Sequence, residues 1–249
     1  MLLRLLAVLL VAGLSAAHPA AAQEEPALTP KQQDAVKKLV HDYLLENPSV
    51  ISEAIEALRQ KEELAAEMDA KKALTDRKEE IFNDPGSPVV GNKKGDISVV
   101  FFFDYRCTYC KSMVDPLFDV VKTDGKVRMV MKEYPILGPD SVTASRAALA
   151  AVNQNRYEEF HKALMHLKGP VNEPTIMKTA AEVGINVEKL KKDMDDTRID
   201  TLLKNNLHLA HALNLNGTPA FIVGDQIVGG AISQQAMKQL IDQARKPKS

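Results

Sequence analysis

The chain has 249 residues, of which 45% are hydrophobic and 26% are charged, and its formal net charge is −1. This composition is typical of a globular protein with a sizeable core and excludes a largely disordered chain. The weak net charge, without a basic stripe interleaved with aromatic residues, argues against nucleic acid as a partner.

The first 22 residues have the features of a secretory signal peptide. A positive charge at Arg4 precedes a short apolar run over residues 5–14, and small residues occupy 20–22. The run is too short to span a bilayer, and the order of these regions predicts cleavage. We therefore expect residues 1–22 to be removed and the mature protein to be periplasmic. Cleavage after Ala17 and an uncleaved membrane anchor are the alternatives.

Residues 23–85 are expected to form an N-terminal helical arm. Residues 29–32 form a helix start with a capping box, and apolar residues recur at helical spacing over 36–44. After an interruption at 47–48, a long second helix with a narrow apolar stripe is expected from about Ser49 to Phe82. Because an amphipathic helix must bury its stripe, we interpret the arm as an oligomerisation element. Packing against its own domain is the alternative.

Residues 86–249 predict an α/β domain. Apolar and β-branched runs predict strands over 97–103 and 127–133, joined by a helix from 107 to about 122. This strand–helix–strand order favours a parallel pair with a crossover connection.

A helical insert of about 139–216 follows the second strand. It is far longer than an ordinary connection within a sheet, so it should form a subdomain beside it. A β-hairpin with strands at 221–223 and 226–228, and a helix over 233–244, complete the domain.

The chain's two cysteines form its central motif, Cys107-Thr108-Tyr109-Cys110, directly after the first predicted strand. At a helix N-terminus, unpaired N–H groups and the positive end of the helix dipole lower the pKa of a thiol. We therefore expect Cys107 to be the exposed attacking thiol and Cys110, one turn inward, to resolve the mixed disulfide. Thr108 and Tyr109 flank the sulfurs and are expected to tune the reduction potential.

Other uses of the cysteine pair have less support. A structural disulfide closing so short a loop would contribute only about 2 kcal/mol. A closed zinc site would need two more ligands, which His208 and His211 on one helix face could supply in principle. Since no other feature favours zinc, the sequence predicts no metal site and no cofactor.

The order of these elements resembles the DsbA family of the thioredoxin superfamily: a strand, a C-x-x-C pair at a helix start, a helical insert, and Thr218-Pro219 before a hairpin. Within that family, the chain is similar to ScsC-type members over residues 44–48, 102–105, 132–139 and 141–151. The resemblance implies a thioredoxin-like α/β fold with an inserted helical subdomain, preceded by the N-terminal arm. It also implies a homo-oligomer, which is a trimer in some members.

The resemblance assigns a substrate site as well. In the family the proline that corresponds to Pro219 is cis and lies beside the cysteine pair. Pro219 and the backbone of Thr218 are therefore expected to line the groove for a cysteine-containing secreted protein. The substrate segment would bind there in extended form, by strand addition.

One position departs from the family pattern. Members often have a buried acid six positions before the first cysteine, where this chain has Phe101. Such a carboxylate would assist proton transfer to and from the buried thiol, and the candidate proton relays here are Asp104 and Glu133. The simpler alternatives are that Asp104 caps the turn and that Glu133 pairs with Lys132.

Together these features predict a periplasmic thiol–disulfide oxidoreductase that acts on secreted proteins as a disulfide isomerase or reductase. The first alternative is a DsbA-type dithiol oxidase, whose cysteine pair a membrane redox partner of unknown identity keeps oxidised. Isomerase and oxidase use the same residues and differ in reduction potential and partner. The second alternative is a protein of a copper-tolerance system that binds copper(I) on the two thiolates.

Overall fold

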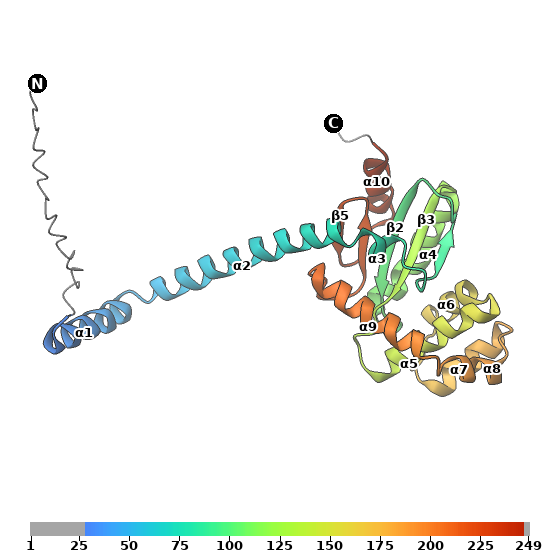
Figure 1. The fold of residues 1–249 in the computed structure, drawn as a ribbon, viewed down its shortest axis with the longest axis horizontal. Coiled ribbons are helices and arrows are strands. Elements are labelled where there is room, and N and C mark those ends of the chain that lie inside the picture. Colours follow the sequence, from blue (N-terminus) through green and yellow to red (C-terminus); the bar gives the residue numbers. More distant parts are fainter. Residues whose placement is uncertain (1–27, 247–249) are drawn as a thin grey trace, which may run out of the picture. The chain divides into compact units, whose positions relative to one another are not determined.

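The structure, a computed structural model, describes residues 28–246, so the predicted signal peptide lies outside the described residues. Its centre is a five-stranded sheet made of β1 (Val89–Gly91), β2 (Ile97–Phe103), β3 (Val127–Glu133), β4 (Ala220–Val223) and β5 (Gln226–Gly229). In space the strands follow the order β1-β3-β2-β4-β5 (Figure 1). The central strands β2 and β3 are parallel, and each other neighbouring pair is antiparallel.

The two central strands have the predicted bounds, and the predicted hairpin is formed by β4 and β5. The register of β2 and β3 pairs Ile97 with Val127 and Phe103 with Glu133, so the two strands end side by side. The sequence missed β1, an edge strand paired to β3. Three residues are too few to show the alternation that identifies a strand.

Successive residues of β2 point to opposite faces of the sheet and join two different cores. Phe101 and Phe103 belong to the core on which α4 (Thr108–Asp124) and α10 (Gln234–Arg245) pack. We call this side the α4 face. Val100 and Phe102 belong to a second core, which includes Ile81 of α3 (Lys78–Phe82). We call this side the α3 face.

Between β3 and β4 the chain forms the expected helical subdomain, which confirms the thioredoxin-like α/β fold with an inserted helical block. Most of its buried residues, such as Phe160 and Leu164, join the core of the α4 face, whereas Leu209 and Ala210 join the core of the α3 face. The subdomain is therefore continuous with the domain that carries the sheet. The helices are α5 (Pro139–Ala150), the short η1 (Ala151–Gln154), α6 (Tyr157–Met165), α7 (Glu173–Glu182), α8 (Val187–Asp193) and α9 (Thr197–Ala212).

The N-terminal residues form the two predicted helices α1 (Pro30–Glu46) and α2 (Ser49–Asp76). The capping box of Thr29 and Gln32 is present at the start of α1. The expectation of one helix from Ser49 to Phe82 is wrong, because the helix stops at Asp76 and α3 begins at Lys78. The break at Arg77 accompanies the complete burial of Ile81 in the core of the α3 face.

The chain divides into two units, one ending at Leu58 and the other beginning at Arg59. In the described part of the first unit, α1 buries none of its residues. None of the helices within residues 28–246 has the length and apolarity that crossing a bilayer requires.

Candidate active site

Cys107 lies at the N-cap of α4, where its side chain meets the free N–H groups of the helix start. Its backbone is extended (φ −73°, ψ 113°), and its sulfur accepts a hydrogen bond from the Cys110 N–H at 3.1 Å. The Cys107 N–H donates to the carbonyl of Asp104 at 3.1 Å, which closes the turn between β2 and α4. The sulfur therefore occupies the position at which a helix N-terminus stabilises an anion.

The two thiols, both free in this structure, differ in acidity. The hydrogen bond with the Cys110 side chain and a weaker one with Thr218 lower the pKa of Cys107 to about 6, although burial acts in the opposite direction. Burial, and then the hydrogen bond with Cys107, raises the pKa of Cys110 far above its ordinary value. The expectation of an exposed Cys107 is wrong, because 6% of its surface is exposed and it lies within the core. Cys110 has no exposed surface, so only Cys107 is both ionised near neutral pH and in contact with solvent.

The Thr218–Pro219 peptide bond is cis, as the family resemblance implied. In its neutral form the Cys107 thiol donates to the Thr218 carbonyl at 3.2 Å, although the two residues are 111 positions apart in the sequence. The carbonyl of Pro219 accepts the N–H of Gly230 at 2.8 Å, which fixes this loop to the chain after β5. The fold therefore places Thr218 and Pro219 directly beside the attacking sulfur.

The two residues between the cysteines lie on the outer side of the first turn of α4. Thr108 is exposed, and Tyr109 keeps 69% of its surface exposed. The Tyr109 backbone N–H contributes to the lowered pKa of Cys107. Tuning of the reduction potential by these two side chains stays a prediction.

Asp104 is completely buried and its carboxylate is fully occupied by donors. One oxygen accepts the Arg106 N–H at 2.7 Å and the Ser141 hydroxyl at 2.8 Å, and the other accepts the N–H groups of Ile136 and Leu137 at 2.9 Å. The bonds from Ile136 and Leu137 tie the cysteine turn to the loop after β3, and the bond from Ser141 ties it to α5. A carboxylate has about four acceptor sites, and these four donors occupy all of them. The geometry therefore favours the simpler alternative, in which Asp104 anchors the turn.

Glu133, at the end of β3, is also completely buried. Its Oε1 accepts the hydroxyls of Tyr105 and Tyr157, both at 2.9 Å, and its Oε2 accepts the Ser145 hydroxyl at 2.7 Å. Burial raises the pKa of Glu133 to about 8, although these three hydrogen bonds act in the opposite direction. The hydroxyl donors could not be recognised in the sequence, because they come from the cysteine turn, α5 and α6.

The proposed pairing of Glu133 with Lys132 is wrong. Adjacent strand residues point to opposite faces, so Lys132 enters the α3 face while Glu133 enters the α4 face. The Lys132 ammonium donates to the Glu80 carbonyl at 2.7 Å and to the Asp84 carboxylate at 3.0 Å.

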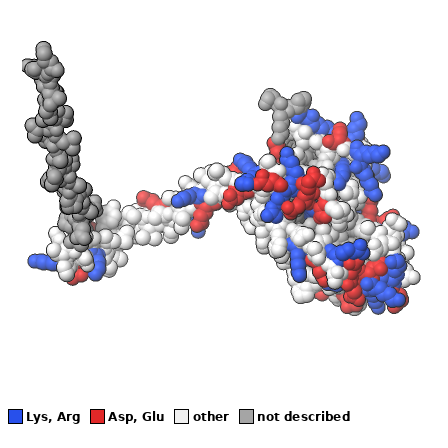
Figure 2. All heavy atoms as spheres, viewed as in Figure 1, with Lys and Arg blue, Asp and Glu red and all other residues white. Residues whose placement is uncertain are grey.

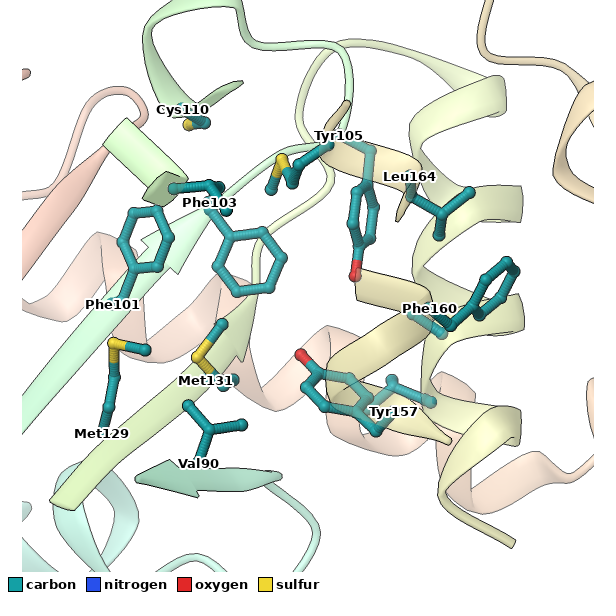
Figure 3. Packing of buried hydrophobic residues seen from close by; sticks show 14 of the residues in the cluster. Val90, Phe101, Phe103, Tyr105, Cys110, Met129, Met131, Tyr157, Phe160 and Leu164 are labelled. Atoms are coloured by element: carbon teal, nitrogen blue, oxygen red, sulfur yellow. The ribbon is translucent and has the colours of Figure 1, made fainter. Parts of the chain in front are cut away.

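The position six residues before Cys107 lies in an aromatic environment. The Phe101 ring stacks on Phe221 and contacts Phe103, each with ring centroids 4.9 Å apart. Figure 3 shows Phe101 and Phe103 beneath Cys110. The buried thiol therefore faces apolar rings at the position where the family often has an acid.

The residues of the zinc alternative are not brought together in the structure. Within residues 28–246, no group of three or more His, Cys, Asp and Glu side chains is arranged to hold a metal ion. The two cysteines with His208 and His211 form no such group.

Two parts of the chain match known families. Residues 82–243 match the family described as thioredoxin, and residues 32–65 match the N-terminal domain of the copper resistance protein ScsC. A thioredoxin-like oxidoreductase from Silicibacter pomeroyi DSS-3 is 43% identical; the match covers 68% of this chain and 98% of that one, with a TM-score of 0.67. A linker-deletion variant of ScsC from Proteus mirabilis is 28% identical over 88% of this chain and 97% of its own, with a TM-score of 0.67.

Curated relatives are more distant. Disulfide bond formation protein D of Bacillus subtilis (strain 168) is 24% identical over 176 residues, which are 66% of this chain and 79% of the relative. The Na(+)/H(+) antiporter NhaA 1 of Salinispora arenicola is 22% identical over 158 residues, but the chain spans only 24% of its length. The similarity to the antiporter therefore concerns about a quarter of that protein.

Proposed function

Since the chain belongs to the DsbA-like thioredoxin family of the ScsC type, we propose that it is a periplasmic thiol–disulfide oxidoreductase that acts on secreted proteins. The observation that carries this proposal is the unequal cysteine pair. Cys107 has a lowered pKa and keeps a small exposed surface, whereas Cys110 is buried and protonated. The Cys110 backbone nitrogen lies 3.1 Å from the Cys107 sulfur. This arrangement suits one thiol for attack and the other for release.

The reaction begins when the Cys107 thiolate attacks one sulfur of a substrate disulfide. A mixed disulfide forms between Cys107 and the substrate, and the substrate's other sulfur leaves as a thiolate. In isomerisation that thiolate, or another in the substrate, attacks the substrate's own disulfides and finally expels Cys107 unchanged. In reduction, Cys110 loses its proton and attacks Cys107, which releases a substrate dithiol and leaves the Cys107–Cys110 disulfide.

The cis-proline loop supports a site for an extended substrate. The Thr218 carbonyl lies 3.2 Å from the attacking sulfur, so a cysteine held along Thr218 and Pro219 would be in reach of it. Backbone groups of an extended segment could pair with this loop as an added strand. Such recognition depends little on side chains and would accept many cysteine-containing proteins.

The N-terminal helices support a homo-oligomer, which we propose to be a trimer by the family resemblance. Large apolar side chains remain at least 46% exposed along α1 and the first half of α2. Figure 2 shows charges of both signs along the second half of α2 and mostly uncharged atoms on the visible face of its first half. An exposed apolar stripe of this length is typical of an interaction surface. The side chains are Val36, Leu39, Val40, Tyr43, Leu45, Ile51, Ile55 and Leu58.

Isomerase activity is the direction that we favour, because an oligomer presents several reactive cysteines around one substrate. The test is the refolding of scrambled ribonuclease. Full-length protein should catalyse it, and deletion of residues 29–58 should abolish it while reduction of a small disulfide continues. The deletion stops at Leu58 because Leu74 and Ile81 belong to the core of the α3 face. Equal isomerase activity of the shortened protein would contradict the role of the arm.

Replacing Cys107 by serine tests the assignment itself. C107S should lose all disulfide exchange, and residual exchange would overturn the proposal. The direction can be measured in cells by trapping the cysteine pair: a mostly reduced pair supports the isomerase, and a mostly oxidised pair supports the DsbA-type oxidase with a membrane partner. Titration of the reduced protein with copper(I), with C107S as the control, tests the copper-binding alternative.

A further inference from the structure

A cluster of buried hydroxyl, carboxyl and imidazole groups lies beneath the cysteine turn. Its centre is Glu133, which accepts hydroxyl hydrogen bonds from Tyr105, Tyr157 and Ser145 at 2.7–2.9 Å. The Tyr105 hydroxyl also lies 3.0 Å from Nδ1 of His161. Figure 3 shows the hydroxyls of Tyr105 and Tyr157 pointing into the same space. The cluster therefore joins the cysteine turn to β3, α5 and α6.

The hydrogen bonds have a definite direction when Glu133 is ionised. A carboxylate only accepts hydrogen bonds, so the Tyr105 hydroxyl donates its one proton to Glu133 and can only accept a hydrogen bond from His161. His161 must then carry its proton on Nδ1. Its Nε2 has no hydrogen-bond partner among the described residues, as expected for the bare nitrogen of a buried neutral imidazole. Burial lowers the pKa of His161 to about 3, so the ring stays neutral.

Protonation of Glu133 breaks this pattern. A carboxylic acid offers a donor in place of one acceptor site, so one of the three hydroxyls must turn away or reverse. Tyr105 has an alternative acceptor in His161 Nδ1, but the imidazole proton would then have to move to the unpartnered Nε2. Among the three hydroxyls, that of Tyr105 lies within hydrogen-bond distance of a second acceptor, so the bond between Glu133 and the cysteine turn is the one that can be exchanged when Glu133 takes up a proton.

The surroundings leave Glu133 without a counter-charge. The groups that face it are the neutral hydroxyls of Tyr105, Tyr157 and Ser145, and the negative Asp104 in the cysteine turn raises its pKa further. On α6, His161 lies near Lys162 and His166, which both lower the pKa of the imidazole. The carboxyl therefore changes its protonation close to neutral pH.

Tyr105 connects this cluster to the reactive sulfur. It precedes Cys107 by two residues, and its ring packs edge-on against Phe103 with centroids 5.5 Å apart. The Cys107 N–H is bonded to the carbonyl of Asp104, the residue before Tyr105. The hydroxyl of Tyr105 is thus a second point at which the turn is fixed, besides the Asp104 carboxylate.

We propose that Glu133 is a positioning residue for disulfide exchange: its ionised carboxylate, acting through the Tyr105 hydroxyl, holds the turn that carries Cys107, and its protonation loosens that hold. The inference rests on the proposed function, because it concerns the reactivity of the same thiol. Glu133 acts on the orientation of Cys107 and takes no part in the transfer of electrons.

The test is the rate at which reduced full-length protein reacts with dithiodipyridine, an uncharged disulfide, as a function of pH. Cys107 is ionised above about pH 7, so a change in rate between about pH 7 and pH 9 reports a second group. The wild type should react about fivefold faster at the upper end, the factor expected for one buried hydrogen bond. E133Q and Y105F should show no such rise.

Y134F is the matched control, because Tyr134 has a buried hydroxyl bonded to the Leu215 carbonyl on the α3 face. It should keep the rise in rate. Infrared difference spectra supply a readout apart from activity: a neutral carboxyl band should disappear over the same pH range and be absent in E133Q. If E133Q does not fold, Y105F gives the same kinetic test, since its ring can still pack against Phe103.

A flat rate for the wild type, or a rise that survives in E133Q, would overturn the inference. Failure of the proposed function would look different, because the wild type would then not exchange disulfides with a cysteine-containing peptide at any pH. A uniform slowing of E133Q at every pH, with the rise retained, would indicate a purely structural role and would also contradict the inference.

Discussion

The two faces of the sheet bury charge in different ways. On the α3 face, Lys132 forms an ion pair with Asp84. Burial alone would raise the pKa of Asp84, but the charge of Lys132 lowers it. On the α4 face, the neighbouring Glu133 meets only neutral hydroxyls and has its pKa raised to about 8 by burial. A paired charge holds a structure at any physiological pH, whereas a charge solvated by hydroxyls can change its state. The two reactive cysteines lie on the α4 face.

The largest expected loss of stability comes from breaking the pair on the α3 face. D84A removes the ion-pair partner of the buried Lys132 ammonium, which keeps only the weaker influence of the Glu80 charge, and should destabilise the protein by about 3 kcal/mol. This is the low end for a buried pair, because Asp84 retains 24% exposure. Urea unfolding measures the loss. The double variant K132M/D84A should recover most of it, and no recovery would mean that Asp84 acts through other contacts, such as its bond to Ser87.

On the α4 face, Y157F should cost about 2 kcal/mol where Glu133 is ionised, since it removes a hydrogen bond to a charged acceptor. The cost should shrink at about pH 6, where Glu133 is protonated and the acceptor is neutral. Urea unfolding at the two pH values gives the comparison. A cost that does not change with pH would contradict the titration of Glu133.

The third effect is a slope of stability against pH. The pKa of Glu133 is raised from 4.5 in the unfolded chain to about 8 in the folded one. Between these values only the folded state binds the proton, so its stabilising effect is complete below 4.5 and is lost as the pH rises toward 8. E133Q should remove a decline of up to about 1.4 kcal/mol per pH unit. Parallel curves for E133Q and wild type would refute this.

The smallest effect is expected for Y134F, which removes one neutral hydrogen bond to the Leu215 carbonyl on the α3 face. The loss should be about 1 kcal/mol and the same at every pH between about 6 and 9. Thermal or urea unfolding would measure it. A loss of stability that changes with pH would contradict the proposed difference between the two faces.

Local patterns predicted much of this protein. The bounds of β2 and β3, the capping box at Thr29 and the position of Cys107 at the start of α4 follow from hydrogen bonds and side-chain periodicity within a few residues. The cis bond at Pro219 was expected from the family resemblance, since the spacing in the sequence does not distinguish it from an ordinary proline at a strand entry.

The sequence by itself thus determined the α/β pattern, the cysteine pair and the unequal roles expected of its members. Only the tertiary structure decided which buried charge has an oppositely charged partner and which carboxyl can change its protonation state near neutral pH. The hydroxyls around Glu133 come from residues 12, 24 and 28 positions away, and Cys107 meets Thr218 across 111 positions. Such contacts depend on how helices pack on a sheet, and a buried carboxyl takes its pKa from whatever that packing places around it.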